Sequence, residues 1–134
     1  MITGLSHVAI AVPSIASAAE TLSRKLGLTV GAIVENAEQG VRLAYVDLGN
    51  ARLELIEPLR PESPVARFLE RNPAGGLHHV SFNVGDLDAA LAATAEAGAR
   101  MVGRRGHNTH GQPIAFLHPA DVLGALVELE ERRT

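Results

Sequence analysis

Two histidines and two glutamates, His7, Glu54, His79 and Glu128, occupy matching positions in two similar halves of the sequence. Each half carries its histidine near the start and its glutamate near the end. Two imidazoles and two carboxylates that are brought together form a suitable ligand set for a divalent cation. Further coordination positions would then remain open to water or to a substrate. The sequence therefore predicts a metal site built from the two halves.

The two halves form an internal repeat. The segment "LSHVAIAVPSIASAAETLSRKLGLTVG" is similar to "LHHVSFNVGDLDAALAATAEAGARMVG", and "RLELIE" is similar to "LVELEE". The histidines are 72 residues apart and the glutamates 74. Similarity at a nearly constant spacing indicates a duplicated unit, and two copies favour a domain with a pseudo-twofold axis.

Each copy predicts one strand, one helix and three further strands. Alternating β-branched residues favour the first strand, and apolar residues at helical spacing follow it until Gly27 or Gly98 ends the helix. The result is an α+β fold of two βαβββ modules. The strands are expected at about 4–12, 28–35, 40–48 and 51–57, and at about 75–84, 99–103, 112–118 and 124–131.

The 134 residues fit a single domain, 1–134. We assign module one to about 3–57 and module two to about 77–131. The linker between them, about 58–76, contains Pro and Gly and predicts a short helix that begins at Ser63 and Pro64.

Strand alternation separates two sets of side chains. Val8, Ile10 and Val12 would pack on the helix of their module, and their counterparts in module two would do the same. The opposite face is small or polar in both copies, as expected of a face that lines a cavity. It carries His7, Ala9 and Ala11 in module one and His79, Ser81 and Asn83 in module two.

Several other polar residues are weaker candidates. Ser81, Asn83 and Gln39 could contact a substrate, and His78, on the face opposite to His79, favours a structural role. The segment 103–113, with His107 and His110, is either a solvated loop or a loop that helps to hold a ligand. His118 has no clear assignment, and the charged end at 128–133 predicts a solvated C-terminus.

Composition excludes several classes of protein. The net charge is −3 and only four aromatic residues occur, so neither a basic face nor a stacking surface for nucleic acid is expected. No apolar run approaches the ~20 residues of a membrane span. No cysteine is present, which rules out disulfides and thiolate chemistry. We expect a cytoplasmic protein whose chemistry relies on His, Asp and Glu.

Three segments, "ELIEPL", "AGGLHHVSF" and "FLHPADVLGALVELE", resemble methylmalonyl-CoA epimerases of the vicinal oxygen chelate superfamily, and the similarity extends over nearly the full chain. The resemblance implies a curved sheet or half-open barrel around a metal site, and a homodimer acting on a small acyl-CoA. It implies a divalent metal, with cobalt favoured and manganese, nickel or zinc possible. His7, His79 and Glu128 match the family's ligands, and Glu54 matches a ligand position that is Gln or Glu.

The implied reaction interconverts (2R)- and (2S)-methylmalonyl-CoA through an enolate by 1,1-proton transfer, which calls for an acid/base group on each side of the reacting carbon. Glu128 is the first candidate. Some members carry the second base at the position of Leu43, and these tend to have Gln where this chain has Glu54. Glu54 could therefore supply the missing carboxylate. Ethylmalonyl-CoA is a reasonable second substrate.

Three alternatives share the scaffold. A glyoxalase I-like lactoylglutathione lyase would use a similar metal set, but it typically has a DPDG-type turn where this chain has His118-Pro119-Ala120-Asp121. A non-catalytic small-molecule binding protein, such as a drug-sequestering member, commonly lacks a complete ligand set. A metal-dependent dioxygenase usually leaves only three protein ligands for its iron.

Overall fold

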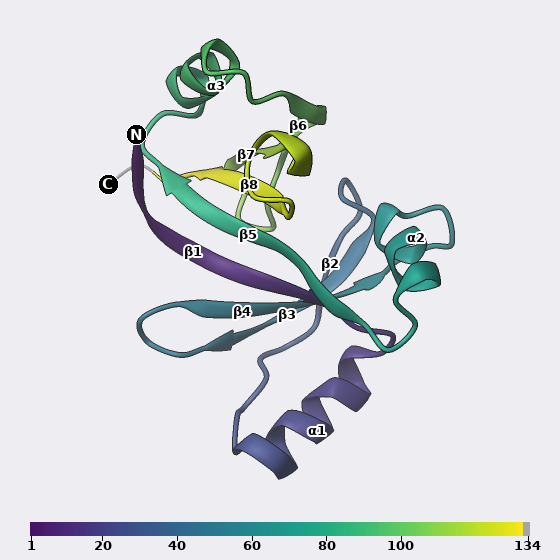
Figure 1. Ribbon diagram of the computed structural model, residues 1–134. Helices are drawn as coiled ribbons and strands as arrows, with labels where there is room; N and C mark the ends of the chain where they lie inside the picture. Colours follow the sequence, from purple (N-terminus) through teal and green to yellow (C-terminus); the bar gives the residue numbers. More distant parts are fainter. Residues whose placement is uncertain (133–134) are drawn as a thin grey trace. The chain divides into compact units, whose positions relative to one another are not determined.

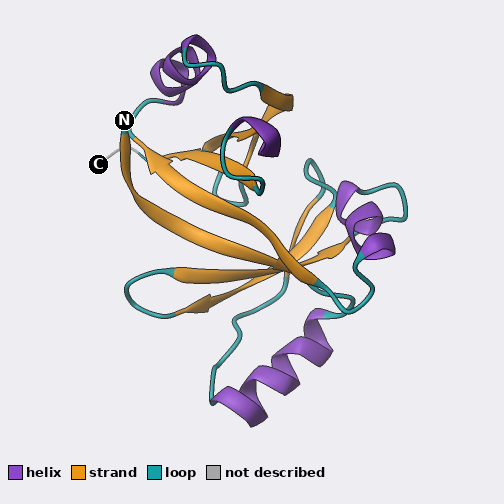
Figure 2. Cartoon of the chain, in the orientation of Figure 1, coloured by secondary structure: helices purple, strands orange, loops and turns teal. Residues whose placement is uncertain are grey.

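The computed structural model describes residues 1–132 and consists of eight strands, three α-helices and one 3₁₀-helix (Figures 1 and 2). The β-α-β-β-β order occurs twice, which confirms the predicted α+β fold of two modules. The elements are β1 (Ile2–Ala11), α1 (Ile15–Leu26), β2 (Val34–Asn36), β3 (Val41–Asp47), β4 (Arg52–Pro58), α2 (Pro64–Arg71), β5 (Gly76–Val84), α3 (Leu87–Glu96), β6 (Met101–His107), β7 (Pro113–Leu117), η1 (Pro119–Asp121) and β8 (Leu126–Glu131).

The strands form one mixed sheet in the order β2-β3-β4-β1-β5-β8-β7-β6. The second half of this order repeats the first in reverse, as expected of a duplicated module. The chain divides into a first unit, Met1–His7 with the chain from His79 onward, and a second unit, Val8–His78. Both β1 and β5 therefore contribute residues to each unit. No helix of the described chain is long and apolar enough to cross a membrane.

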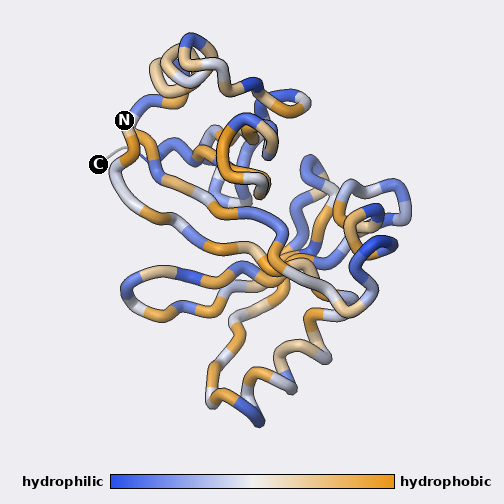
Figure 3. The backbone as a smooth tube through the Cα atoms, viewed as in Figure 1, coloured by the Kyte–Doolittle hydropathy of each residue, from blue (hydrophilic) through white to orange (hydrophobic). Residues whose placement is uncertain are grey.

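In the second unit, α1 ends at Gly27, as the sequence predicts, and begins after Ser14. Ser14 accepts a hydrogen bond from the Ser17 backbone N–H, and Gly27 ends the helix with a φ of 66°. The helix carries both hydrophobic and hydrophilic residues (Figure 3). Its apolar side packs on β1, β3 and β4 in a cluster made of Ile10, Val12, Ile15, Ala18, Leu22, Val30, Ala44 and Leu55.

The other face of β1 differs from the expectation in this unit. Ala9 and Ala11 do not line a cavity but are fully buried in an apolar cluster with Leu43 and Ile56. Helix α2 contributes Val65 to the same cluster. The alanines are small because this face packs closely against neighbouring side chains, a role that alternation alone cannot distinguish from cavity lining.

The strand expected at 28–35 is also wrong for most of its length, because only Val34–Asn36 is a strand. Upstream of it, the Gly31 backbone N–H donates to the Tyr45 carbonyl at 2.9 Å. The glycine-rich segment 103–113 is largely a hairpin rather than a loop, since β6 extends to His107 and β7 begins at Pro113. Asn108 closes its turn by accepting from the backbone N–H groups of His110 and Gln112.

The first unit contains α3, which Asp86 caps through the Ala89 backbone N–H. The predicted helix-facing side of β5 is confirmed here, because Phe82 and Val84 pack against α3 and β8. Strand β5 pairs with β8 in parallel, and β8 pairs with β7 in antiparallel. The core of this unit consists of Val84, Leu87, Ala90, Ala115, Leu117, Val127 and Leu129.

The acidic part of the charged C-terminal end is not solvated as the sequence analysis expected, whereas Arg132 is exposed and position 133 lies outside the described residues. Glu130 and Glu131 are 4% and 9% exposed. Glu131 accepts a hydrogen bond from the Leu87 backbone N–H at the start of α3, and Glu57 does the same for Ile15 at the start of α1. Each module thus ties the end of its last strand to the N-terminus of its helix, where backbone donors lack intrahelical partners and favour a negative charge.

His78 has a structural position in the second unit. Its ring makes an edge-to-face contact with Phe68 of α2, with 5.1 Å between ring centroids. Burial lowers the pKa of His78 from 6.5 to about 4, because the protonated imidazole would lose its hydration. His78 therefore packs on Phe68 as a neutral imidazole.

We predict that Glu131→Ala lowers the free energy of unfolding by about 1–3 kcal/mol, because a buried hydrogen bond to a charged group is lost and the Leu87 N–H loses an acceptor. Urea denaturation would measure the change. Glu62→Ala is the control, since Glu62 is largely exposed and pairs only across the surface with Arg60; it should change stability by less than about 0.5 kcal/mol. Equal losses in the two variants would contradict the capping role.

A second prediction concerns pH. The pKa of His78 is lower in the folded state, so the unfolded state binds more protons between about pH 4 and 6.5 and stability falls as the pH falls through this window. Replacing His78 by Leu should remove about 1–2 kcal/mol of this loss between pH 7 and pH 5. Denaturation curves at both pH values would show it, and parallel pH dependences for the two proteins would refute it.

Candidate functional site

Three of the four predicted ligands come together within the first unit. His7 lies on β1, His79 on β5 and Glu128 on β8, and their exposed fractions are 2%, 4% and 5%. Ser81 is the residue of β5 that pairs with Glu128. Alternation then places the side chains of His79, Ser81 and Glu128 on the same face of the sheet.

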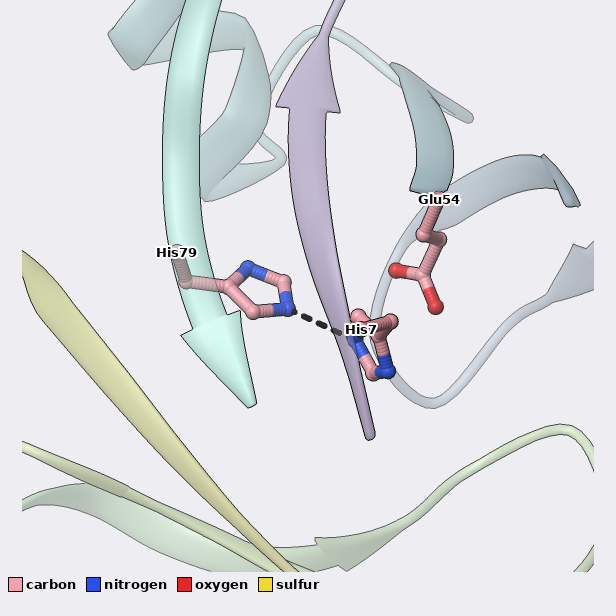
Figure 4. A group of neighbouring side chains, drawn as sticks. All are labelled: His7, Glu54 and His79. Atoms are coloured by element: carbon pink, nitrogen blue, oxygen red, sulfur yellow. Dashed lines mark hydrogen bonds between the residues drawn. The ribbon is translucent and has the colours of Figure 1, made fainter. Parts of the chain in front are cut away.

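The side chains point at a common centre. The Nε2 atoms of His7 and His79 are 3.2 Å apart, and Figure 4 shows the two rings facing each other from β1 and β5. Glu128 places Oε1 3.5 Å from Nε2 of His7 and Oε2 3.8 Å from Nε2 of His79. The rings meet edge to face, with 5.4 Å between centroids. Two ring nitrogens and a carboxylate thus converge in a space largely closed to solvent.

This geometry fits a divalent cation. Two imidazoles that bind one ion at about 2.0–2.1 Å hold their nitrogens about 3.0 Å apart at octahedral angles and about 3.4 Å apart at tetrahedral angles. The observed separation of 3.2 Å lies between these values. A buried carboxylate beside two imidazoles also gives the negative charge and the nitrogen lone pairs that such an ion needs. The described chain therefore contains a buried His/Glu group that could bind a metal.

Ser81 supports Glu128 directly. It is fully buried, and its hydroxyl donates to Oε1 of Glu128 at 2.7 Å. A short bond to a carboxylate is strong and fixes the rotamer of the acid. A substrate contact for Ser81 stays a prediction.

The neighbourhood of His79 is partly aromatic. Phe116 of β7 pairs with Glu128 across the sheet and packs edge to face on the His79 ring, with 5.4 Å between centroids. An apolar ring at this position keeps water from the imidazole. It also lowers the local dielectric and strengthens the electrostatic interactions in the site.

Two residues next to His7 were missed by the sequence analysis. Ser6 lies 3.0 Å from Nδ1 of His7 through its hydroxyl, and the same hydroxyl donates to Oε1 of Glu130 at 3.4 Å. All three residues are buried. Alternation offered a signal for Glu130, since it stands two residues after Glu128 and shares its face. Ser6 gave no signal, because it precedes His7 on the strand and should point the other way.

Glu54 belongs to the second unit, on β4, and is 7% exposed. It pairs directly with Tyr45 on β3, and the next pair on the same face is Leu43 with Ile56. The Arg52 guanidinium lies 4.3 Å from the centroid of the Tyr45 ring. A buried carboxylate therefore shares one face of this hairpin with an aromatic ring and an arginine.

Of the remaining candidates, Asn83 lies on the same face of β5 as His79 and Ser81 and pairs with Glu130. Its backbone carbonyl accepts a hydrogen bond from the Thr3 hydroxyl, and the residue is buried. The backbone N–H of Gln39 donates to the Asn36 side chain in the turn between β2 and β3. Their substrate contacts stay predictions. His118 caps η1 by accepting a hydrogen bond from the Ala120 backbone N–H. Asp121, in the same 3₁₀-helix, forms a bidentate salt bridge with the Arg100 guanidinium.

Several known proteins are similar to this chain in sequence and in fold. A family model described as Glyoxalase/Bleomycin resistance protein/Dioxygenase superfamily matches residues 6–116. The chain is 47% identical over 133 residues to an ethylmalonyl-CoA/methylmalonyl-CoA epimerase of Cereibacter sphaeroides, covering 98% of this chain and 99% of that protein.

Solved structures agree. A methylmalonyl-CoA epimerase from Mycobacterium tuberculosis matches with a TM-score of 0.89 and 33% identity, covering 99% of this chain and 90% of that one. A methylmalonyl-CoA epimerase in complex with methylmalonyl-CoA and NH4+ matches with a TM-score of 0.87 and 33% identity, covering 98% and 95%. The chain belongs to the methylmalonyl-CoA epimerase family of the Glyoxalase/Bleomycin resistance protein/Dioxygenase superfamily.

Proposed function

We propose that this protein is an isomerase that interconverts (2R)- and (2S)-methylmalonyl-CoA. One observation carries the proposal: a chain that matches an epimerase of this substrate over nearly its whole length also buries two imidazoles against a carboxylate. Such a cluster has no evident use in a purely structural protein, because burying ionisable groups without compensation is costly.

The metal site that we propose contains His7, His79, Glu128 and Glu54. The first three converge in the first unit, where the two Nε2 atoms and the Glu128 carboxylate lie within 4 Å of one another. Glu54 is supported by its burial and by its position in the repeat, where it matches Glu128. Cobalt is the metal we favour, with manganese, nickel and zinc as alternatives, because imidazole and carboxylate ligands suit all of them.

The chemistry follows from the acidity of the substrate. The proton to be removed lies between a thioester carbonyl and a carboxylate, and its loss gives an enolate. A bound divalent cation would supply positive charge that stabilises the negative charge developing on the substrate oxygens. Glu128 accepts the proton on one side of the carbon. We assign the transfer to Oε2, because Oε1 already accepts the Ser81 hydrogen bond.

The second proton comes from the opposite side. Leu43 occupies the position where some members carry a glutamate, and leucine has no proton to exchange. Leu43 is itself packed in the apolar cluster of the second unit, at 4% exposure. Glu54 is the carboxylate that we assign to this step, and it shares the face of the β3–β4 hairpin on which Leu43 lies.

The substrate is a small acyl-CoA, and we include ethylmalonyl-CoA because the Cereibacter sphaeroides relative carries both substrates in its name. We further propose that the enzyme acts as a homodimer in the cytoplasm. The support is the resemblance of the whole chain to this family, together with the bacterial source of that relative.

Solvent exchange would test the activity. We expect the purified protein in D₂O to incorporate deuterium at the α-carbon of methylmalonyl-CoA and to interconvert its epimers. Removal of metal with a chelator should abolish the exchange, and added Co²⁺ should restore it. Methylglyoxal with glutathione is the control substrate pair. Turnover of this pair, without exchange into methylmalonyl-CoA, would identify the glyoxalase I-like lyase instead.

The role of Glu54 has a separate test. Because general acid–base groups contribute about 10²–10⁴-fold, Glu54→Gln should lower epimerisation at least about 100-fold while Glu62→Gln leaves it unchanged. Exchange into one epimer should survive, since Glu128 still serves one side. Adding Leu43→Glu should recover activity by restoring a carboxylate on the same face of the hairpin. Full turnover by Glu54→Gln in both directions would contradict the assignment of Glu54 as the second acid/base group.

A further inference from the structure

We infer that Glu130 and Ser6 are positioning residues that orient His7 for metal binding and fix which of its ring nitrogens carries the proton. This inference rests on the metal site proposed above. It adds a pair of residues that do not touch the ion or the substrate. The residues lie in one unit of the chain, so their geometry can be given atom by atom.

The contacts form a chain of hydrogen bonds that ends on a carboxylate. The Ser6 hydroxyl lies 3.0 Å from Nδ1 of His7 and donates to Oε1 of Glu130 at 3.4 Å. Because a hydroxyl has a single proton, donation to Glu130 leaves the Ser6 oxygen as an acceptor for His7. In this arrangement Nδ1 of His7 carries the proton and donates it to Ser6. Nε2 is left with its lone pair, which is the form that binds a metal.

Glu130 also belongs to a group with His7 and Glu128 that could hold a metal ion, but its carboxylate lies beside Nδ1 of His7 rather than beside Nε2. Its Oε2 atom lies 3.9 Å from Nδ1 of His7, whereas His79 and Glu128 approach Nε2 of that ring at 3.2 and 3.5 Å. The two nitrogens of an imidazole point in different directions, so an ion bound at Nε2 is separated from Glu130 by the ring. We therefore assign Glu130 to the orientation of His7, and not to the ion bound at Nε2.

Both Glu130 and Ser6 are buried, so their contacts with His7 are not surface contacts. Glu130 is 4% exposed and Ser6 5% exposed. Among the residues that the structure describes, His7 is the sole ion-pair partner of Glu130 within 4.0 Å. A buried carboxylate next to a neutral ring is unfavourable. A cation on Nε2 would polarise the imidazole and make its Nδ1–H a better donor, which offsets this cost. Residues that orient metal ligands in this way typically change metal affinity 10–100-fold.

Binding of Co²⁺ alone tests the inference. We expect Glu130→Gln and Ser6→Ala each to weaken Co²⁺ binding by about 10-fold or more, measured by titration calorimetry and by the visible absorption of the bound ion. Since the two residues act in one chain, the double variant should lose no more than the weaker-binding single variant. Nitrogen-15 NMR of the metal-free protein should show the His7 proton on Nδ1 in the wild type and a mixture of tautomers in both single variants.

The matched control is Glu131→Gln. This residue is the neighbour of Glu130, is also buried, and caps α3 instead of contacting His7. It should lower the melting temperature and leave Co²⁺ affinity unchanged. Folded Glu130→Gln and Ser6→Ala variants that bind Co²⁺ as tightly as the wild type would overturn the inference. A wild type that binds no Co²⁺ would overturn the proposed metal site as well, so the two failures are distinguishable.

Discussion

The site depends on the close approach of two imidazoles in a buried space. Their Nε2 atoms lie 3.2 Å apart, and both face Glu128. Without an ion this contact is a hydrogen bond, in which one Nε2 donates its proton to the other. A shared cation would take the place of that proton and bind a lone pair of each ring. Both arrangements require the rings to stay at a fixed separation, and neighbouring strands with fixed register supply it.

Register and alternation make that rigidity possible. Parallel pairing of β5 with β8 places Ser81 opposite Glu128, so the serine lies where it can fix the acid. The same strand ends in Glu131, which is tied to the first turn of α3. One short strand thus alternates between groups that serve the site, Glu128 and Glu130, and groups that belong to the core, Val127 and Leu129.

Much of this could be predicted from the sequence, because duplication shows each pattern twice. The helices, the βαβββ order and the common face of His79 and Glu128 all followed from periodicity. Local sequence patterns could not show which other elements pack on each face of a strand. Ala9 and Ala11 resemble cavity residues until α2 is seen to bring Val65 into their cluster. Ser6 was missed for a related reason: alternation predicts the direction of a side chain on a strand, but a short hydroxyl can still reach the ring of its neighbour.

Duplication places Glu54 and Glu128 at equivalent positions, but the surroundings of the two residues differ. In the first unit, His7 and Glu128 have buried polar partners, Ser6 and Ser81, that fix their orientation. In the second unit, Glu54 lies opposite Tyr45, on a hairpin face that also carries Arg52, Leu43 and Ile56. A duplicated strand therefore preserves the direction of a side chain, whereas the neighbouring strands decide which groups that side chain contacts.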